Sequence, residues 1–234
     1  MTTIAWIMNI PRAPHRWKVS PKRAIAIQSE LADRVRLDGE IGQPRLAAGA
    51  DIAFSKDGAE CIAAAVLWDI RRECLVEHHV VRRPLSFPYV PGLLSFREAP
   101  AIVAALRTLQ HEPDVFLFDG QGYAHPRRFG LASHVGVWLD RPSIGCAKSI
   151  LVGDGEVPAR SKGSFRPLTH RDELVGISLR TRADVKPMYI SVGHRISLDA
   201  ARRIVLQCCT RYRMPEPTRL ADKLVAEVKR DSSA

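Results

Sequence analysis

The sequence predicts an α/β fold built on one mixed β-sheet with helices on its faces. Three strand-like runs follow one another between residues 46 and 82 with short polar turns between them, which indicates antiparallel pairing. After them, apolar runs of strand length alternate with helical patterns, which is typical of parallel βαβ units. The 234 residues contain no internal repeat and no long linker, so we expect a single domain over residues 1–234.

The N-terminal part is expected to contain an arm, a helix and the three antiparallel strands. Residues 1–20 should be irregular, because prolines at positions 11, 14 and 21 interrupt any helix. Apolar residues at helical spacing predict a helix from Pro21 to Arg36, with the proline at its first position. The predicted strands are Leu46–Ser55, Cys61–Ile70 and Cys74–Arg82.

The remainder is expected to supply the parallel strands and their crossover helices. A helix begins near Ser95, which is a plausible N-cap, and runs to Leu109. No element is predicted between residues 148 and 164, where the chain is rich in Gly and Lys. The other predicted elements are Val115–Phe118, Phe129–Leu139, Ser143–Ala147, Glu173–Arg180, Met188–Val192, Leu198–Tyr212 and Thr218–Val228. Three antiparallel strands followed by parallel ones is the layout of ribonuclease H-like sheets.

Composition limits the possible partners and the compartment. Lys and Arg number 35 against 25 Asp and Glu, a formal charge of +10, which favours a polyanionic partner. The five cysteines are odd in number and form no C-x-x-C pair, which argues against zinc fingers and ribbons. No apolar run approaches the length of about 20 residues that a membrane span needs. The first residues also lack a basic leader region, so we expect a cytoplasmic protein.

Three carboxylates stand out by their positions. Asp51 lies inside an apolar strand, Asp119 ends another, and Glu98 lies in the first turn of the helix from Ser95. An unpaired carboxylate among apolar residues is unfavourable unless a cation offsets it, and carboxylate oxygens suit Mg²⁺ or Mn²⁺. The alternatives are that Asp119 is a turn residue and that Glu98 only complements the helix dipole. Asp51 is the hardest to explain in this way, because Asp is disfavoured within strands.

Two further segments accompany these acids. The loop after Asp119 carries His125, and Lys148 ends the next strand, so both are expected near the same edge of the sheet. Alternatively, His125 caps a helix and Lys148 is an ordinary surface lysine. The segment Pro88–Pro91, which we call the wedge segment, places a tyrosine between prolines just before Glu98. Such rigid apolar groups can enter between bases, although Tyr89 packing on the core is the simpler alternative.

The sequence resembles the endonuclease V family over roughly three quarters of its length. The resemblance rests on six strings in family order: GADIAF, PYVPGLLSFRE, DGQGYAHPRRFGLASHVG, PSIGCAKS, SVGHRISLDAA and RMPEPTRLAD. It implies a ribonuclease H-like fold and hydrolysis of the second phosphodiester 3′ to deoxyinosine in DNA. The products would be 3′-hydroxyl and 5′-phosphate ends, and other deaminated bases are possible targets.

The resemblance also implies roles for particular residues. Asp51, Glu98 and Asp119 would be catalytic and would hold Mg²⁺, or Mn²⁺ as a substitute, with His194 also near the metal. His125 and Lys148 would be further catalytic residues. The DNA wedge corresponds to Pro88, Tyr89, Val90 and Pro91, and the pocket for the flipped base to Gly92, Leu94, Gly120 and Gly130.

Two other functions remain open at this point. The first is a ribonuclease H-like nuclease of different specificity, such as one that acts on inosine-containing or structured RNA or DNA. The second is a basic nucleic-acid-binding module whose acids are merely structural. The trio of acids together with His125 and Lys148 argues against a pure binder. We expect the protein to act as a monomer.

Overall fold

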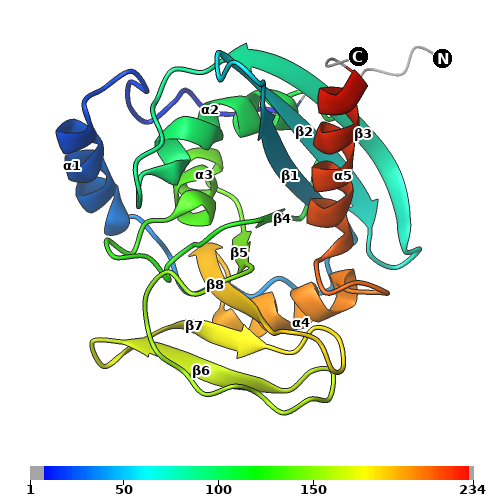
Figure 1. Cartoon of the computed structure of the whole chain (residues 1–234). Coiled ribbons are helices and arrows are strands. Elements are labelled where there is room, and N and C mark those ends of the chain that lie inside the picture. The colour runs from blue at the N-terminus through cyan, green and yellow to red at the C-terminus, as the bar shows by residue number, and fades with distance from the viewer. Residues whose placement is uncertain (1–7, 232–234) are drawn as a thin grey trace.

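One eight-stranded sheet forms the centre of the molecule (Figure 1). The computed structural model describes residues 8–231. The strands are β1 (Leu46–Phe54), β2 (Glu60–Asp69), β3 (Cys74–Pro84), β4 (Val115–Phe118), β5 (Ser143–Ala147), β6 (Phe165–His170), β7 (Glu173–Leu179) and β8 (Met188–His194). The helices are α1 (Pro21–Ala32), α2 (Leu94–Leu106), α3 (Leu131–Leu139), α4 (Leu198–Cys208) and α5 (Glu216–Asp231). The strand order is β3-β2-β1-β4-β5-β8-β7-β6.

The mixed sheet is confirmed, and its directions differ from the prediction in one part. β1, β2 and β3 pair antiparallel, and β4 and β5 lie parallel to β1, as the sequence predicts. β8, β7 and β6 then pair antiparallel instead of forming further crossovers. β6 and β7 are joined by Arg171 and Asp172, which have φ of 57° and 60°. Two left-handed residues in succession make the two-residue turn that returns a strand on itself.

Several element boundaries also differ from the sequence-based expectation. β6 was not predicted: the sequence analysis places no strand between Ala147 and Glu173, and β6 lies in that interval. It is the last strand of the sheet, where Pro167 is tolerated because an edge strand has N–H groups that need no partner strand. The helix predicted from Ser95 begins at Leu94 instead, and Ser95 is not its N-cap. Glu98 therefore lies beyond the first turn of α2. Part of the predicted arm, residues 1–7, lies outside the described residues, and residues 8–20 contain no helix or strand.

Alternating side chains of the central strands build a core on each face of the sheet. Ala48 and Ala50 of β1 face α2 and α3, whereas Ala47 faces the side of α4. On that second side α5 packs across β1 and β2 (Figure 1). All five cysteines lie in the described part of the chain, and all are free thiols. Within residues 8–231 no helix is both long enough and apolar enough to cross a membrane.

Candidate functional site

The three predicted carboxylates converge at one edge of the sheet. Ala50 of β1 pairs with Phe118 of β4, so the next residues, Asp51 and Asp119, lie side by side. Glu98 reaches the same place from α2, and its carboxylate feels the charges of both aspartates. This is the carboxyl end of the parallel strands, where open α/β sheets bind ligands. The structure therefore brings together the three acids that the sequence analysis singled out.

The environment of these acids disfavours negative charge. Burial raises the pKa of Asp51 to about 7, with the Asp119 charge adding to the effect. Burial likewise raises the pKa of Glu98 to about 8, reinforced by repulsion from Asp51 and Asp119 and opposed by Arg97. Desolvation and like charges both favour the protonated form of a carboxyl group. At pH 7 Glu98 is therefore mostly protonated and Asp51 about half protonated, and a bound positive charge would displace these protons.

A fourth acid, Asp222 of α5, belongs to the same group. Its side chain hydrogen-bonds that of Asp51 and raises the pKa of Asp51 further. The contact arises because α5 begins directly on β1: a Cβ added to Gly49 would lie 2.3 Å from the carbonyl carbon of Pro217. Asp51 is two residues beyond Gly49 and points to the same face. The sequence analysis quoted RLAD as a motif string but assigned Asp222 no role. We call Asp51, Glu98, Asp119 and Asp222 the carboxylate cluster.

Lys148 supplies a positive charge to this cluster. Its Nζ lies 2.6 Å from Oδ2 of Asp119. Burial lowers the pKa of Lys148, but the hydrogen bond and the charge of Asp119 outweigh this and raise it overall. Lys148 follows the last residue of β5, the neighbour of β4. Adjacent parallel strands thus deliver the acid and the lysine to the same edge, as predicted.

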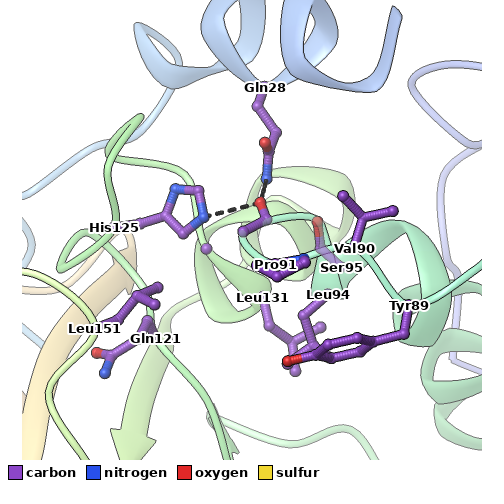
Figure 2. A pocket seen from close by; sticks show the side chains of 12 residues that line it. Gln28, Tyr89, Val90, Pro91, Leu94, Ser95, Gln121, His125, Leu131 and Leu151 are labelled. Carbon is purple, nitrogen blue, oxygen red and sulfur yellow. Dashed lines mark hydrogen bonds between the residues drawn. The ribbon is translucent and has the colours of Figure 1, made fainter. Parts of the chain in front are cut away.

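A pocket with a volume of about 160 Å³ lies beside the carboxylate cluster (Figure 2). It adjoins the cluster through two elements: Leu94 is one turn before Glu98 on α2, and Gln121 is two residues after Asp119. Its walls are Gln28, Tyr89, Val90, Pro91, Gly92, Leu94, Ser95, Gln121, His125, Gly130, Leu131 and Leu151.

Most residues predicted for the wedge and the base pocket lie in these walls. Tyr89 is 70% exposed at the rim, so it does not pack on the core. Pro88 and Gly120 do not line the pocket. Gly120 supports it from behind, because a Cβ there would lie 3.3 Å from Cδ2 of Leu131. The sequence analysis gave no role to Gln28, Gln121 and Leu151.

His125 belongs to the pocket and is not coupled to the carboxylate cluster. Its Nδ1 accepts a hydrogen bond from the backbone N–H of Arg127 (3.2 Å), which leaves the proton on Nε2. That Nε2–H donates to the carbonyl oxygen of Gly92 at 3.0 Å (Figure 2). Burial, together with the charges of Arg127 and Arg128, lowers the pKa of His125 to about 4. His125 is therefore a neutral, fixed donor that holds the backbone of the pocket.

The loop around His125 is used for internal contacts. Arg127 and Arg128 both have guanidinium groups that are occupied by protein partners. Arg127 bonds Gln28 and Gly92, and Arg128 forms an ion pair with Glu173 of the β6–β7 hairpin at 2.7 Å. Gly122 is likewise required by an internal contact, because a Cβ there would lie 2.1 Å from the carbonyl oxygen of Val192. This glycine lets the chain pack against itself rather than against a ligand.

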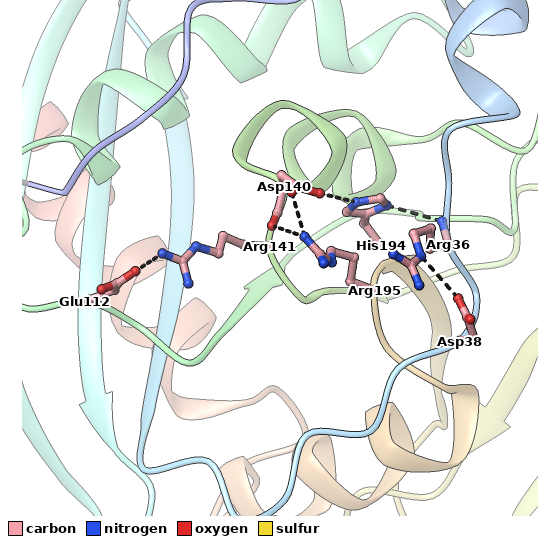
Figure 3. Close-up of polar contacts among 7 residues, drawn as sticks. All are labelled: Arg36, Asp38, Glu112, Asp140, Arg141, His194 and Arg195. Carbon is pink, nitrogen blue, oxygen red and sulfur yellow. Dashed lines mark hydrogen bonds and ion pairs between the residues drawn. The ribbon is translucent and has the colours of Figure 1, made fainter.

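His194 lies at the end of β5 opposite to Lys148, among the polar contacts that Figure 3 shows. It pairs with Ser143 at the start of β5, whereas Lys148 follows the end of that strand, a separation of about 16 Å along five residues. Both ring nitrogens are engaged: Nε2 lies 3.2 Å from Oδ1 of Asp140, and Nδ1 accepts from the backbone N–H of Arg36 at 3.2 Å. The structure thus does not bring His194 to the carboxylate cluster. Instead, the hydrogen bonds of His194 connect β8 to the end of α3 and to the segment after α1.

The chemistry of the carboxylate cluster fits a divalent cation. Lys148 is the counter-charge of Asp119, and burial together with the neighbouring negative charges raises the pKa values of Asp51 and Glu98. Hard oxygen ligands of this kind suit Mg²⁺ and Mn²⁺. Within residues 8–231 no three His, Cys, Asp or Glu side chains already stand in the arrangement of a metal-binding set.

Comparison with known proteins supports the same interpretation. The endonuclease V family model matches residues 29–223. Endonuclease V of Nostoc sp. is 49% identical over 214 residues, covering 91% of this chain and 97% of that protein. The crystal structure of endonuclease V from Streptomyces avermitilis is 41% identical, with a TM-score of 0.89 and coverage of 97% and 100%.

A third relative was solved with nucleic acid. It is endonuclease V of Ciona intestinalis, in complex with a 24-mer DNA that contains an inosine followed by a ribo-adenosine. It is 27% identical to this chain, with a TM-score of 0.79, and the match covers 90% of this chain and 98% of that one. On the strength of the family model and the Nostoc relative, this chain belongs to the endonuclease V family.

Proposed function

We propose that this protein is a metal-dependent endodeoxyribonuclease of DNA repair. It cuts the strand at the second phosphodiester 3′ to deoxyinosine and leaves 3′-hydroxyl and 5′-phosphate ends. The observation that carries the proposal is the carboxylate cluster beside a pocket whose rim is the wedge segment. A flipped base in the pocket would place its own strand across the acids. The Ciona complex with inosine-containing DNA supports the choice of lesion.

The pocket offers backbone donors for a deaminated purine. α2 and α3 both begin at the pocket, and neither receives a side-chain cap from the described residues. The first N–H groups of a helix lack partners within the helix. Those of Phe96 and Ala132 already donate to the carbonyl oxygens of Leu93 and Gln121, so the N–H groups of the wall residues Leu94 and Leu131 are the ones suited to bind an acceptor. Hypoxanthine presents the O6 acceptor where adenine presents an amino group. A damaged or mispaired base is also easier to extrude than a normal one.

The wedge segment is suited to hold the strands apart. Tyr89 projects at the rim with 70% of its surface exposed, between two prolines that stiffen the backbone on either side. An exposed ring on a rigid segment can insert between bases and compensate for lost stacking. We propose that Pro88, Tyr89, Val90 and Pro91 perform this role, with Gly92, Leu94 and Gly130 forming the adjoining base pocket and Gly120 supporting it.

Asp51, Glu98, Asp119 and Asp222 are the residues that would hold the metal ion. When bound, Mg²⁺ or Mn²⁺ would polarise the scissile phosphate and stabilise the leaving oxygen. Lys148 orients the Asp119 carboxylate through their ion pair and adds positive charge where negative charge grows in the transition state.

The test is nicking of a labelled duplex that contains one inosine, with the cut mapped to the nucleotide. We expect cutting with Mg²⁺ or Mn²⁺ and none in a chelator. Asp51→Asn and Asp119→Asn should abolish nicking and retain binding to the duplex. Asp33→Asn, an exposed acid after α1, is the matched control and should cut normally. Full activity of either cluster variant would overturn the metal assignment.

Inosine in RNA is the second candidate substrate. A specific observation favours it: the nucleic acid in the Ciona complex carries a ribo-adenosine directly after the inosine. Matched DNA, RNA and mixed oligonucleotides decide between the two. If kcat/KM on the RNA strand exceeds that on the DNA strand, the DNA assignment is replaced by an inosine-directed ribonuclease.

The remaining expectations are also proposals. We propose that residues 1–234 act as one nuclease domain, as a monomer, in the cytoplasm. The free thiols of all five cysteines fit a reducing compartment. Light scattering should give a mass near 26.0 kDa for the free protein, and a mass twice as large would exclude the monomer.

A further inference from the structure

The carbonyl oxygen of Gly92 receives three side-chain donors. Nε2 of Gln28 lies at 3.1 Å, Nε2 of His125 at 3.0 Å and Nη2 of Arg127 at 2.7 Å. Gly92 itself has φ of +76°, in the left-handed region, and it joins the wedge segment to α2. The three donors fix the plane of the peptide that follows Gly92. Figure 2 shows Gln28 from above and His125 from the left reaching the same oxygen.

Gln28 connects both walls of the pocket. Besides Gly92, its Nε2 donates to the carbonyl oxygen of Phe129 at 3.1 Å, the residue before the wall residue Gly130. Its Oε1 accepts from Nε of Arg127 at 2.7 Å. The two N–H bonds of a side-chain amide are thus directed at two backbone carbonyls, one on each wall. With its donors used in this way, Gln28 acts on the pocket through the backbone.

Gln28 lies on the buried face of α1, where an apolar side chain is the usual choice. Ala24 and Ile27 pack with Phe87 and Leu93, which flank the wedge segment, so α1 is docked beside it. Gln28 follows on the same buried face and is only 1% exposed. A buried amide is unfavourable by roughly 1–3 kcal/mol unless its groups are hydrogen-bonded. An apolar residue would meet the packing needs of this face, so the glutamine serves its polar contacts.

We propose that Gln28 is a positioning residue for base selection: it sets the spacing of the Gly92 and Phe129–Gly130 walls and so the preference for the deaminated base. The backbone of Gly92 is tightly packed at this point, because a Cβ on Gly92 would lie 2.9 Å from Nη2 of Arg127. If the Gly92 wall shifts, the helix N-termini at the pocket no longer meet the base edge. This inference rests on the proposed function, since it takes the occupant to be a flipped purine.

The test compares two variants and a neighbour. Gln28→Leu removes all three polar contacts at similar size. Gln28→Glu keeps the acceptor for Arg127 and loses both donors. Ser29→Ala, an exposed residue whose hydroxyl bonds only within α1, is the control. Each is assayed on an inosine duplex and on the same duplex with adenine, after circular dichroism and melting have confirmed folding.

We expect the inosine-over-adenine ratio of kcat/KM to fall roughly 10–100-fold in both Gln28 variants, since small misplacements of binding groups have effects of this size. The loss should fall on KM, with kcat at saturating substrate within about threefold of the parent, because the carboxylate cluster is untouched. A parent-like ratio in a folded Gln28→Glu protein would overturn the inference even if Gln28→Leu failed to fold. If the parent itself showed no preference for inosine, the proposed function would fail first.

Discussion

Replacing Glu98 by glutamine should stabilise the metal-free protein while it abolishes nicking. Burial and two neighbouring aspartates raise the pKa of Glu98 from 4.5 to about 8. An acid whose pKa is raised by folding carries no penalty below pH 4.5, where both states are protonated. Folding stability is then lost as pH rises from 4.5 to about 8, because the unfolded chain ionises first. The pocket residues, including Gln28, do not contribute to this pKa shift of Glu98.

The magnitude follows from the interval between the two pKa values. Each pH unit corresponds to about 1.36 kcal/mol, so the interval from 4.5 to pH 7 amounts to about 3 kcal/mol. Since a chain of this size shifts by roughly 2–4 °C for each kcal/mol, Glu98→Gln should melt about 6–12 °C higher at pH 7 in chelator. At pH 4.5 the difference should nearly vanish.

The assay is thermal unfolding in chelator across pH 4.5 to 8. Glu60→Gln, an exposed acid at the start of β2, is the control and should follow the parent at every pH. Adding Mg²⁺ should raise the melting temperature of the parent more than that of Glu98→Gln, because the ion replaces protons on the same oxygens. The reasoning is refuted if the variant melts at or below the parent at pH 7, or if the gap does not grow with pH.

Three further outcomes follow from the site. Tyr89→Ala should leave the melting temperature unchanged, since the side chain is exposed, and should lower the preference for inosine over undamaged duplex several-fold in a binding titration. Lys148→Ala removes the ion pair with Asp119 and should slow single-turnover nicking by roughly 100-fold, whereas unchanged rates would show that the lysine is only a surface group. Asp222→Asn removes one carboxylate charge beside Asp51 and should raise the Mg²⁺ concentration for half-maximal rate, measured by metal titration.

Much of this fold was predictable because its central strands carry strong local patterns. β1, β4 and β5 read as apolar runs, and their order along the chain implies that Asp51, Asp119 and Lys148 share an edge. Asp51 was recognisable as a disfavoured residue within a strand. β6 was not, because an exposed edge strand with a proline has no apolar alternation to detect.

The pocket and the fourth acid show where local patterns stop being informative. Asp222 lies on an amphipathic helix among other charged residues, and only the packing of α5 on Gly49 brings it to Asp51. Gln28 looks like any polar residue of a helix until its partners, about 64 and 101 positions away, are known. The metal role of His194 was inferred from a motif string alone. His194 ends β8 and lies beside the start of β5, because β8 pairs antiparallel with β5, and the residues of β8 do not reveal that direction.

α5 contributes both to the stability of the sheet and to the carboxylate cluster. This helix covers Ile62, Ala64 and Val66 of β2 and supplies Asp222 from the last element that the structure describes. A chain cleaved before Glu216 would expose that apolar strip to solvent and lack one acid. Loss of α5 should therefore weaken the sheet and the metal-binding set together, because one helix supports both.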